Sequence, residues 1–161
     1  MVSDRAHQSE PAQGNSQKLL IEDLPEQTAF EGDCDYVLMT WDERHKPRRK
    51  YTTDSGREVS IALPRGTTLS DGTILHREPG LAIIVRAQPE SVIVITPADQ
   101  NEACLAAHQI GNWHRSLQLT EKGELVAEDD GPMRAWLRRS GIAHHPESRV
   151  FQPNIRVSGH D

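Results

Sequence analysis

Two continuous apolar segments, residues 81–85 and 92–95, constrain the fold of this chain more than any other feature. Such runs are typical of strands that are buried on both faces of a sheet. Between them, residues 89–91 (Pro-Glu-Ser) predict a turn or a domain hinge. Only 35% of the 161 residues are hydrophobic and 4% are aromatic, which favours two small β-rich lobes over one large core. We therefore expect an α+β protein with two small domains.

The sequence before residue 81 has the signals of short strands. Residues 59–63 alternate Val, Ile and Leu with Ser and Ala, which is the period of a half-buried strand. Residues 54–56 (Asp-Ser-Gly) predict a turn just ahead of it. Residues 1–17 are rich in Ser, Gln, Asn, Pro and Gly and are expected to form a disordered tail. Residues 18–88 are therefore predicted to form an all-β domain.

The sequence after residue 95 has the signals of two helices. Residues 98–110 contain good helix formers with acidic residues near the start, and Gly111 stands where a helix usually stops in a left-handed turn. A second helix is predicted between Asp130 and Gly141, with basic residues near its end. Its apolar residues fall at helical spacing: Met133, Trp136 and Leu137.

A last strand is expected at residues 150–157, which completes the order β-α-β-β-α-β beginning at residues 92–95. That order resembles a ferredoxin-like sandwich with two helices on one face of an antiparallel sheet. Residues 89–157 are therefore predicted to form a ferredoxin-like domain, followed by a flexible tail at residues 158–161.

Charge and motifs exclude several classes of function. The net charge of −6 and the pI of about 5.7 disfavour nonspecific nucleic-acid binding. The two cysteines form neither a disulfide framework nor a Cys-x-x-Cys pair. Residues 1–17 lack the apolar run of a signal peptide, and no segment is long enough to span a membrane, so we expect a cytoplasmic protein. No phosphate loop, nucleophile elbow or zinc-protease motif predicts an enzyme.

Histidine is the residue type that could carry chemistry here. Neutral imidazole is a good ligand for nickel, copper and zinc. His114 follows the predicted helix end on a short exposed connection, where a ring nitrogen could reach an ion. A surface histidine without a role is the alternative, and one imidazole cannot hold a metal tightly. A symmetric dimer would place two copies of His114 face to face.

The other histidines are weaker candidates for metal ligands. His108 follows Cys104 by four residues, so the two share a helix face, although Cys104 resembles a small core residue. His160 stands on a tail that could fold over a metal site, or it is simply exposed. His144 and His145 are adjacent and are expected to lie in a solvated loop.

The basic stretch at residues 44–50 (Arg-His-Lys-Pro-Arg-Arg-Lys) is the strongest charge feature. It is either the charged face of a strand or loop, or a docking patch for an acidic partner protein. RNA binding is a weaker alternative, because only Tyr51 supplies an adjacent aromatic ring.

Three segments together resemble the UreE family of urease accessory proteins. The first comprises residues 42–48 (Asp-Glu-Arg-His-Lys-Pro-Arg) and 54–59 (Asp-Ser-Gly-Arg-Glu-Val), similar to the family's basic segment and hairpin. The second is residues 63–72 (Leu-Pro-Arg-Gly-Thr-Thr-Leu-Ser-Asp-Gly), similar to its Leu-Pro-Arg-Gly…Asp-Gly signature. The third is residues 106–114 (Ala-Ala-His-Gln-Ile-Gly-Asn-Trp-His), similar to its Leu-Gly-Asn-Arg-His helix end. The match runs from about residue 19 to residue 155, in the right order.

The resemblance implies an all-β domain that binds partners and a ferredoxin-like domain that binds metal. It implies a homodimer sharing one site, with His114 from both subunits as the ligand and His160 and His108 as further candidates. It also implies delivery of Ni²⁺ to the urease apoprotein together with the accessory GTPase, with Zn²⁺ or Cu²⁺ able to bind in vitro. Nucleic acid and membrane are not expected partners. The predicted partner-binding residues are basic and lie in the first two segments: Arg44, Lys46, Arg48 and Arg65.

The chain departs from the family pattern in three places. Trp113 stands where the family has Arg, so a contact there is expected to differ. Residues 125–130 lack the additional histidines of some members, and His160 alone represents their His-rich tail. We therefore expect about one ion per dimer, a carrier and not a store.

Two other functions remain open at this stage. One is a metal-free adaptor that docks onto an RNA–protein assembly through its basic β domain. The other is a hydrolase using His114 with Asp129 or Asp130, which no nucleophile motif supports.

Overall fold

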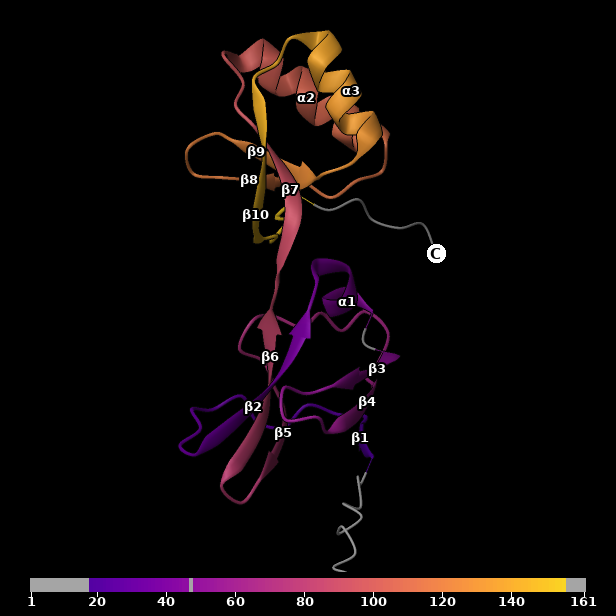
Figure 1. Cartoon of the computed structure of the whole chain (residues 1–161), viewed down its shortest axis with the longest axis vertical. Coiled ribbons are helices and arrows are strands. Elements are labelled where there is room, and N and C mark those ends of the chain that lie inside the picture. Colours follow the sequence, from indigo (N-terminus) through magenta and orange to yellow (C-terminus); the bar gives the residue numbers. More distant parts are fainter. Residues whose placement is uncertain (1–17, 47, 156–161) are drawn as a thin grey trace, which may run out of the picture.

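The computed structural model describes residues 18–46 and 48–155. The tails predicted at residues 1–17 and 158–161 lie outside this range. Figure 1 shows two domains that are stacked along the long axis of the molecule and connected through β6 and β7. This arrangement confirms the prediction of an α+β protein with two domains. None of the helices in the described range is long and apolar enough to cross a membrane.

The N-terminal domain consists of two three-stranded sheets around one core. The first sheet has the order β1-β4-β3, and the second has the order β2-β6-β5. Strands β1 and β2 pair in parallel with β4 and β6, whereas the other neighbours are antiparallel. The elements are β1 (Leu19–Ile21), β2 (Asp33–Met39), α1 (Trp41–His45), β3 (Arg48–Thr52), β4 (Glu58–Ala62), β5 (Ile74–Glu78) and β6 (Leu81–Ala87).

The period-two pattern at residues 59–63 is confirmed by β4, where Val59 and Ile61 are buried in this core. The turn predicted just before it is also present, with Gly56 at φ 89°. A β-branched or bulky residue would be strained at that angle, because only glycine adopts it without steric cost.

The N-terminal domain of six strands also contains one short helix, α1. Thr40 caps its start: the Thr40 Oγ1 atom accepts from the Glu43 N–H at 3.3 Å, and the Thr40 N–H donates to Glu43 Oε2 at 2.9 Å. This reciprocal pair is a capping box, and its Thr-x-x-Glu signature is visible in the sequence. The basic stretch therefore divides between the end of α1 and the start of β3.

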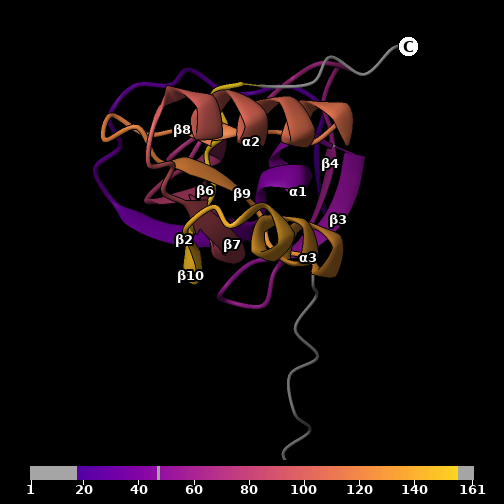
Figure 2. The same ribbon diagram turned by 90° about the horizontal axis from the view of Figure 1, so that it is seen from above.

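The C-terminal domain has the predicted βαββαβ order. Its sheet has the order β10-β7-β9-β8 and is antiparallel throughout. Helices α2 and α3 cover one face of this sheet at the end of the molecule away from the N-terminal domain (Figure 1), and Figure 2 shows both helices in front of the sheet. The elements are β7 (Pro89–Ile95), α2 (Gln100–Asn112), β8 (Gln118–Leu119), β9 (Leu125–Glu128), α3 (Gly131–Ser140) and β10 (His144–Val150).

Two predicted details of this domain are wrong. Of the turn and the domain hinge that were the alternatives for residues 89–91, the turn is wrong: these residues begin β7 at the boundary between the domains, and only Gln88 separates β6 from β7. The last strand covers residues 144–150 and ends where the predicted strand begins. β10 is an edge strand that is largely exposed, and an edge strand does not need the apolar pattern used to find it. His144 and His145 therefore lie in a strand, not in a loop.

A buried cluster joins the two domains. Val92, Val94 and Val126 face away from the helices and pack with Trp41 of α1 and with Phe151. Because successive side chains of a strand point to opposite faces of the sheet, β7 contributes to both the C-terminal core and this joint. The five residues of this buried cluster are at most 9% exposed. Through Trp41, α1 therefore connects the N-terminal domain to the face of the C-terminal sheet that the helices do not cover.

Candidate metal site

The end of α2 differs from its prediction, and the difference places His114. The helix continues through Gly111 and ends at Asn112, with Trp113 as its C-cap. The left-handed residue that ends it is His114, with φ 55°. Among the described residues it is the one non-glycine residue with a positive φ.

Two hydrogen bonds define this helix end. The His114 N–H donates to the Gly111 carbonyl at 2.9 Å, and the Arg115 N–H donates to the Ile110 carbonyl at 3.2 Å. This is the Schellman arrangement, in which the left-handed position is usually glycine. A residue with a Cβ atom is less stable there by about 1–2 kcal/mol. The fold alone therefore does not favour histidine at this position.

Neighbouring contacts fix the backbone around His114. The rings of Trp113 and Trp136 lie edge to face with centroids 6.2 Å apart. The Arg115 guanidinium lies 5.3 Å from the Trp113 ring and forms an ion pair with Asp130. Asp130 also caps α3, accepting from the Met133 N–H at 2.8 Å. The end of α2 is thus attached to the start of α3, while the His114 side chain stays exposed.

His108 and Cys104 are both exposed on α2, which corrects the description of Cys104 as a core residue. They share the outer face of the helix with Leu105, which is 51% exposed. His108 precedes His114 by six positions, and α2 ends between them at Asn112. His160, the third predicted ligand, lies outside the described residues.

No metal site is complete within the part of the chain that the structure describes. It contains no group of three or more His, Cys, Asp or Glu residues that could hold an ion. His145 lies 3.4 Å from Glu147, and His76 lies 3.6 Å from Glu78, but each is only a pair. A tight site at His114 therefore needs donors from outside the described residues.

The predicted partner-binding residues separate into two groups. Arg44 is only 2% exposed, and it donates to the Phe151 carbonyl at 2.9 Å, within the joint between the domains. Burial lowers the pKa of its guanidinium, and the nearby carboxylates of Glu90 and Asp71 oppose that shift. The prediction of Arg44 as a docking residue is therefore corrected to a role within the joint.

The other three are exposed and lie together. They line a cavity of about 250 Å³ between the end of α1 and the loop that follows β4. We call this cavity the basic groove, and its lining residues are His45, Lys46, Arg48, Leu63, Arg65 and Gly66.

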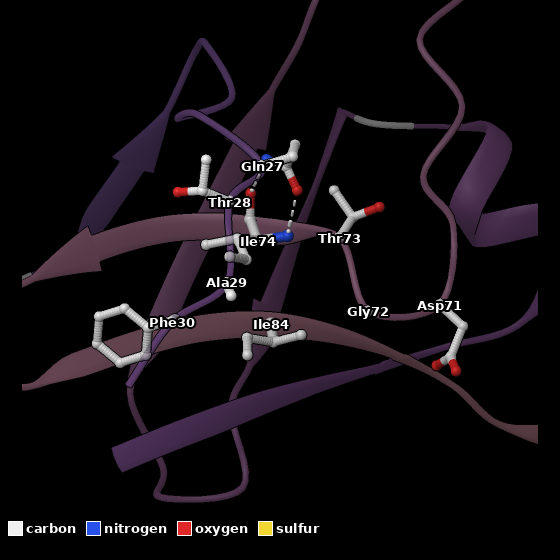
Figure 3. Close-up of a pocket in the computed structure, with 9 residues that line it drawn as sticks. All are labelled: Gln27, Thr28, Ala29, Phe30, Asp71, Gly72, Thr73, Ile74 and Ile84. Carbon is white, nitrogen blue, oxygen red and sulfur yellow. Dashed lines mark hydrogen bonds between the residues drawn. The ribbon is translucent and has the colours of Figure 1, made fainter. Parts of the chain in front are cut away.

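A second, larger groove was not predicted by the sequence. It has a volume of about 540 Å³ and lies between residues 27–30 and residues 71–74 (Figure 3). The Gln27 side chain forms one wall, donating to the Ile74 carbonyl at 2.9 Å and accepting from the Ile74 N–H at 2.8 Å. Asp71, the one titratable residue in its lining, already accepts from the Ala87 N–H at 2.8 Å. This groove therefore presents no chemistry of its own.

Comparison with known proteins gives a consistent result. The chain matches the family described as UreE urease accessory protein, N-terminal domain, over residues 20–88, and the corresponding C-terminal domain over residues 90–161. A urease accessory protein UreE from Deinococcus radiodurans is 36% identical over 127 residues, which cover 79% of this chain and 81% of that protein. One from Synechococcus is 41% identical over 114 residues, covering 70% and 75%. One from Burkholderia ambifaria is 35% identical over 123 residues, covering 76% of this chain and 60% of that protein.

Proposed function

Because the chain belongs to the UreE family of urease accessory proteins, we propose that it binds nickel and delivers it to the urease apoprotein during assembly of its metal centre. The family membership confirms the resemblance based on the three sequence segments, and it implies a role in urease maturation. The proposal adds the identity of the cargo, the residue that carries it and the partners that receive it.

The observation that carries the proposal is the conformation of His114. Its backbone is fixed in a left-handed position that favours glycine, and its imidazole is exposed. An imidazole nitrogen is a good ligand for Ni²⁺, and Zn²⁺ or Cu²⁺ would compete for the same nitrogen in vitro. A rigid backbone with an accessible side chain suits a ligand that must accept an ion and release it.

A second copy of the chain completes the site in this proposal. An isologous dimer interface at the end of α2 would place two His114 rings on its symmetry axis, giving about one ion per dimer. His160 supplies a further nitrogen, and His108 is the other candidate. A site with so few protein ligands is open to ligand exchange, and protonation of histidine releases the ion.

The partners in this proposal are the urease apoprotein and the accessory GTPase, in the cytoplasm. The chain acts as a carrier and not as a catalyst, and neither nucleic acid nor membrane takes part. The exposed basic residues Lys46, Arg48 and Arg65 are the proposed contacts to partner proteins.

Isothermal titration with Ni²⁺ tests the proposal. We expect His114→Ala to lower the affinity at least about 100-fold, because the site loses a ligand from each subunit. His145→Ala is the matched control, since it removes another exposed imidazole from a strand of the same domain. Unchanged affinity and stoichiometry in His114→Ala would overturn the assignment, and a wild-type chain that binds no nickel would favour the adaptor hypothesis.

A further inference from the structure

The outer face of α2 carries a cysteine and a histidine one helical turn apart. Cys104 and His108 occupy positions i and i+4, so their side chains lie on the same face of the helix with Cβ atoms about 5–6 Å apart. Both residues are exposed. Neither side chain forms a hydrogen bond, an ion pair or a ring contact with any residue that the structure describes. A thiol and an imidazole are therefore available to share one ligand.

The backbone that carries this pair is held in place. Cys104 and His108 lie about one turn inside the ends of α2, and Asp99 caps the start of the helix. On the opposite side of the helix, Ala106 and Ile110 are fully buried in the core of the C-terminal domain. Two ligands on a packed helix lose little conformational freedom when they bind, so less of the binding free energy is spent on ordering them.

The spacing of the pair suits a single tetrahedral ion. A zinc ion lies about 2.3 Å from a cysteine sulfur and about 2.0 Å from a histidine nitrogen, so the two donor atoms are at most about 4 Å apart. Side chains one helical turn apart reach this separation by rotation about their χ angles.

The donor atoms favour zinc over nickel. Thiolate suits zinc or copper(I), whereas imidazole suits zinc, copper or nickel. Mixed sets of sulfur and nitrogen ligands in tetrahedral geometry are typical of zinc. Since the thiolate is the form that binds metal, the thiol proton is released to water when the ion binds.

We propose that Cys104 and His108 bind Zn²⁺ in a second metal site, on the outer face of α2 and separate from His114. The cysteine sulfur and one histidine nitrogen hold the ion, and water fills its remaining positions. His114 does not belong to this face, because α2 ends at Asn112 and His114 follows in a left-handed conformation. The site does not depend on the proposed delivery of nickel, and Zn²⁺ bound there does not compete for the His114 imidazole.

Titration of the reduced full chain with Co²⁺ tests this proposal, because Co²⁺ can replace zinc and a thiolate bound to it absorbs in the near ultraviolet. We expect this absorption in wild type and its complete loss in Cys104→Ser. His108→Ala should weaken Co²⁺ binding at least about 10-fold, because it removes one of two protein ligands. Zn²⁺ added to the wild-type Co²⁺ complex should remove the absorption, since it takes the same ligands.

The matched control is Cys34→Ser. Cys34 is the other cysteine of the chain and is also exposed, but no histidine stands four residues before or after it. This variant should keep the absorption of wild type. Thermal melting of the metal-free variants is measured alongside, and wild-type values are expected because the substituted residues are exposed.

Four results would overturn the proposal: no absorption in wild type, absorption that persists in Cys104→Ser, equal losses in Cys104→Ser and Cys34→Ser, or unchanged Co²⁺ affinity in His108→Ala. His114→Ala separates the zinc site from the nickel assignment, since it should keep the Co²⁺ absorption while losing nickel affinity. Loss of the absorption in His114→Ala would overturn the separate site. Retained absorption with unchanged nickel binding would support the zinc site and overturn only the nickel assignment.

Discussion

The two helices of the C-terminal domain are both followed by a residue with a positive φ angle, but the residue differs. Helix α3 ends on Gly141, at φ 70°, where a left-handed residue costs least. Helix α2 ends on His114, at φ 55°, where the same geometry carries a Cβ atom and an imidazole ring. Both helices begin with an aspartate cap, Asp99 and Asp130, so their N-terminal caps do not distinguish them. The comparison indicates that α3 is followed by the residue that best suits the fold, whereas α2 is followed by a residue that the fold alone does not favour.

Removing Asp130 should have the largest effect on stability among the changes that test this comparison. Asp130→Ala removes the cap of α3 and the ion pair to Arg115, so we expect a loss of about 2 kcal/mol in the free energy of unfolding. Urea denaturation measures this value. Asp130→Asn is the matched variant, because asparagine keeps the capping oxygen and loses only the charge. Equal losses in both variants would show that the ion pair, and not the cap, dominates.

Introducing a Cβ atom at the end of α3 should have a smaller effect. Gly141→Ala places alanine at φ 70°, and we expect a loss of about 1 kcal/mol. A Cβ atom at this position has no atom within 4 Å, so conformational strain is the only cost expected. A free energy of unfolding equal to that of wild type would mean that this turn tolerates a side chain. The left-handed conformation of His114 would then give no reason to expect a loss of stability there.

Acid should weaken the start of α3 by a smaller amount. The hydrogen bond from Arg134 lowers the pKa of the Asp129 carboxyl from its ordinary value of 3.8. A lowered pKa contributes stability above the unfolded value, and this contribution is lost as the pH falls through the folded one. We expect Asp129→Asn to be slightly less stable than wild type at pH 7, with the difference disappearing at low pH. A difference that grows with acidity would contradict this sign.

The sequence was sufficient for α3 but not for the end of α2. Asp130, Gly141 and the spacing of the apolar residues predicted the second helix almost to its ends, because each local signal agreed with the final fold. At the end of α2, the expectation that a left-handed residue is glycine selected Gly111 and missed His114. The left-handed conformation of His114 depends on backbone hydrogen bonds, which cannot be predicted from the type of any one residue.

Other features depend on contacts between distant residues. The hydrogen bond from Arg44 to the Phe151 carbonyl joins positions 107 residues apart. The burial of Arg44 could therefore not be predicted from the basic stretch in which it stands. The polar strand β10 was missed because it is held by pairing to β7 and not by an apolar face. Helix α1 could have been found from its capping box at Thr40 and Glu43. The described residues do not bring together a complete set of metal ligands, so the sequence expectation at His114 stays a prediction.

The substitution His114→Gly tests the central claim most directly, because it separates the backbone from the ligand. Glycine suits the left-handed position, so we expect the free energy of unfolding of the metal-free protein to rise by about 1 kcal/mol. The same variant loses the imidazole, so titration should show nickel affinity at least about 100-fold lower than that of wild type. A variant that is more stable and binds nickel at least about 100-fold more weakly is the predicted result. A variant that is less stable than wild type, or that binds nickel as wild type does, would contradict the account.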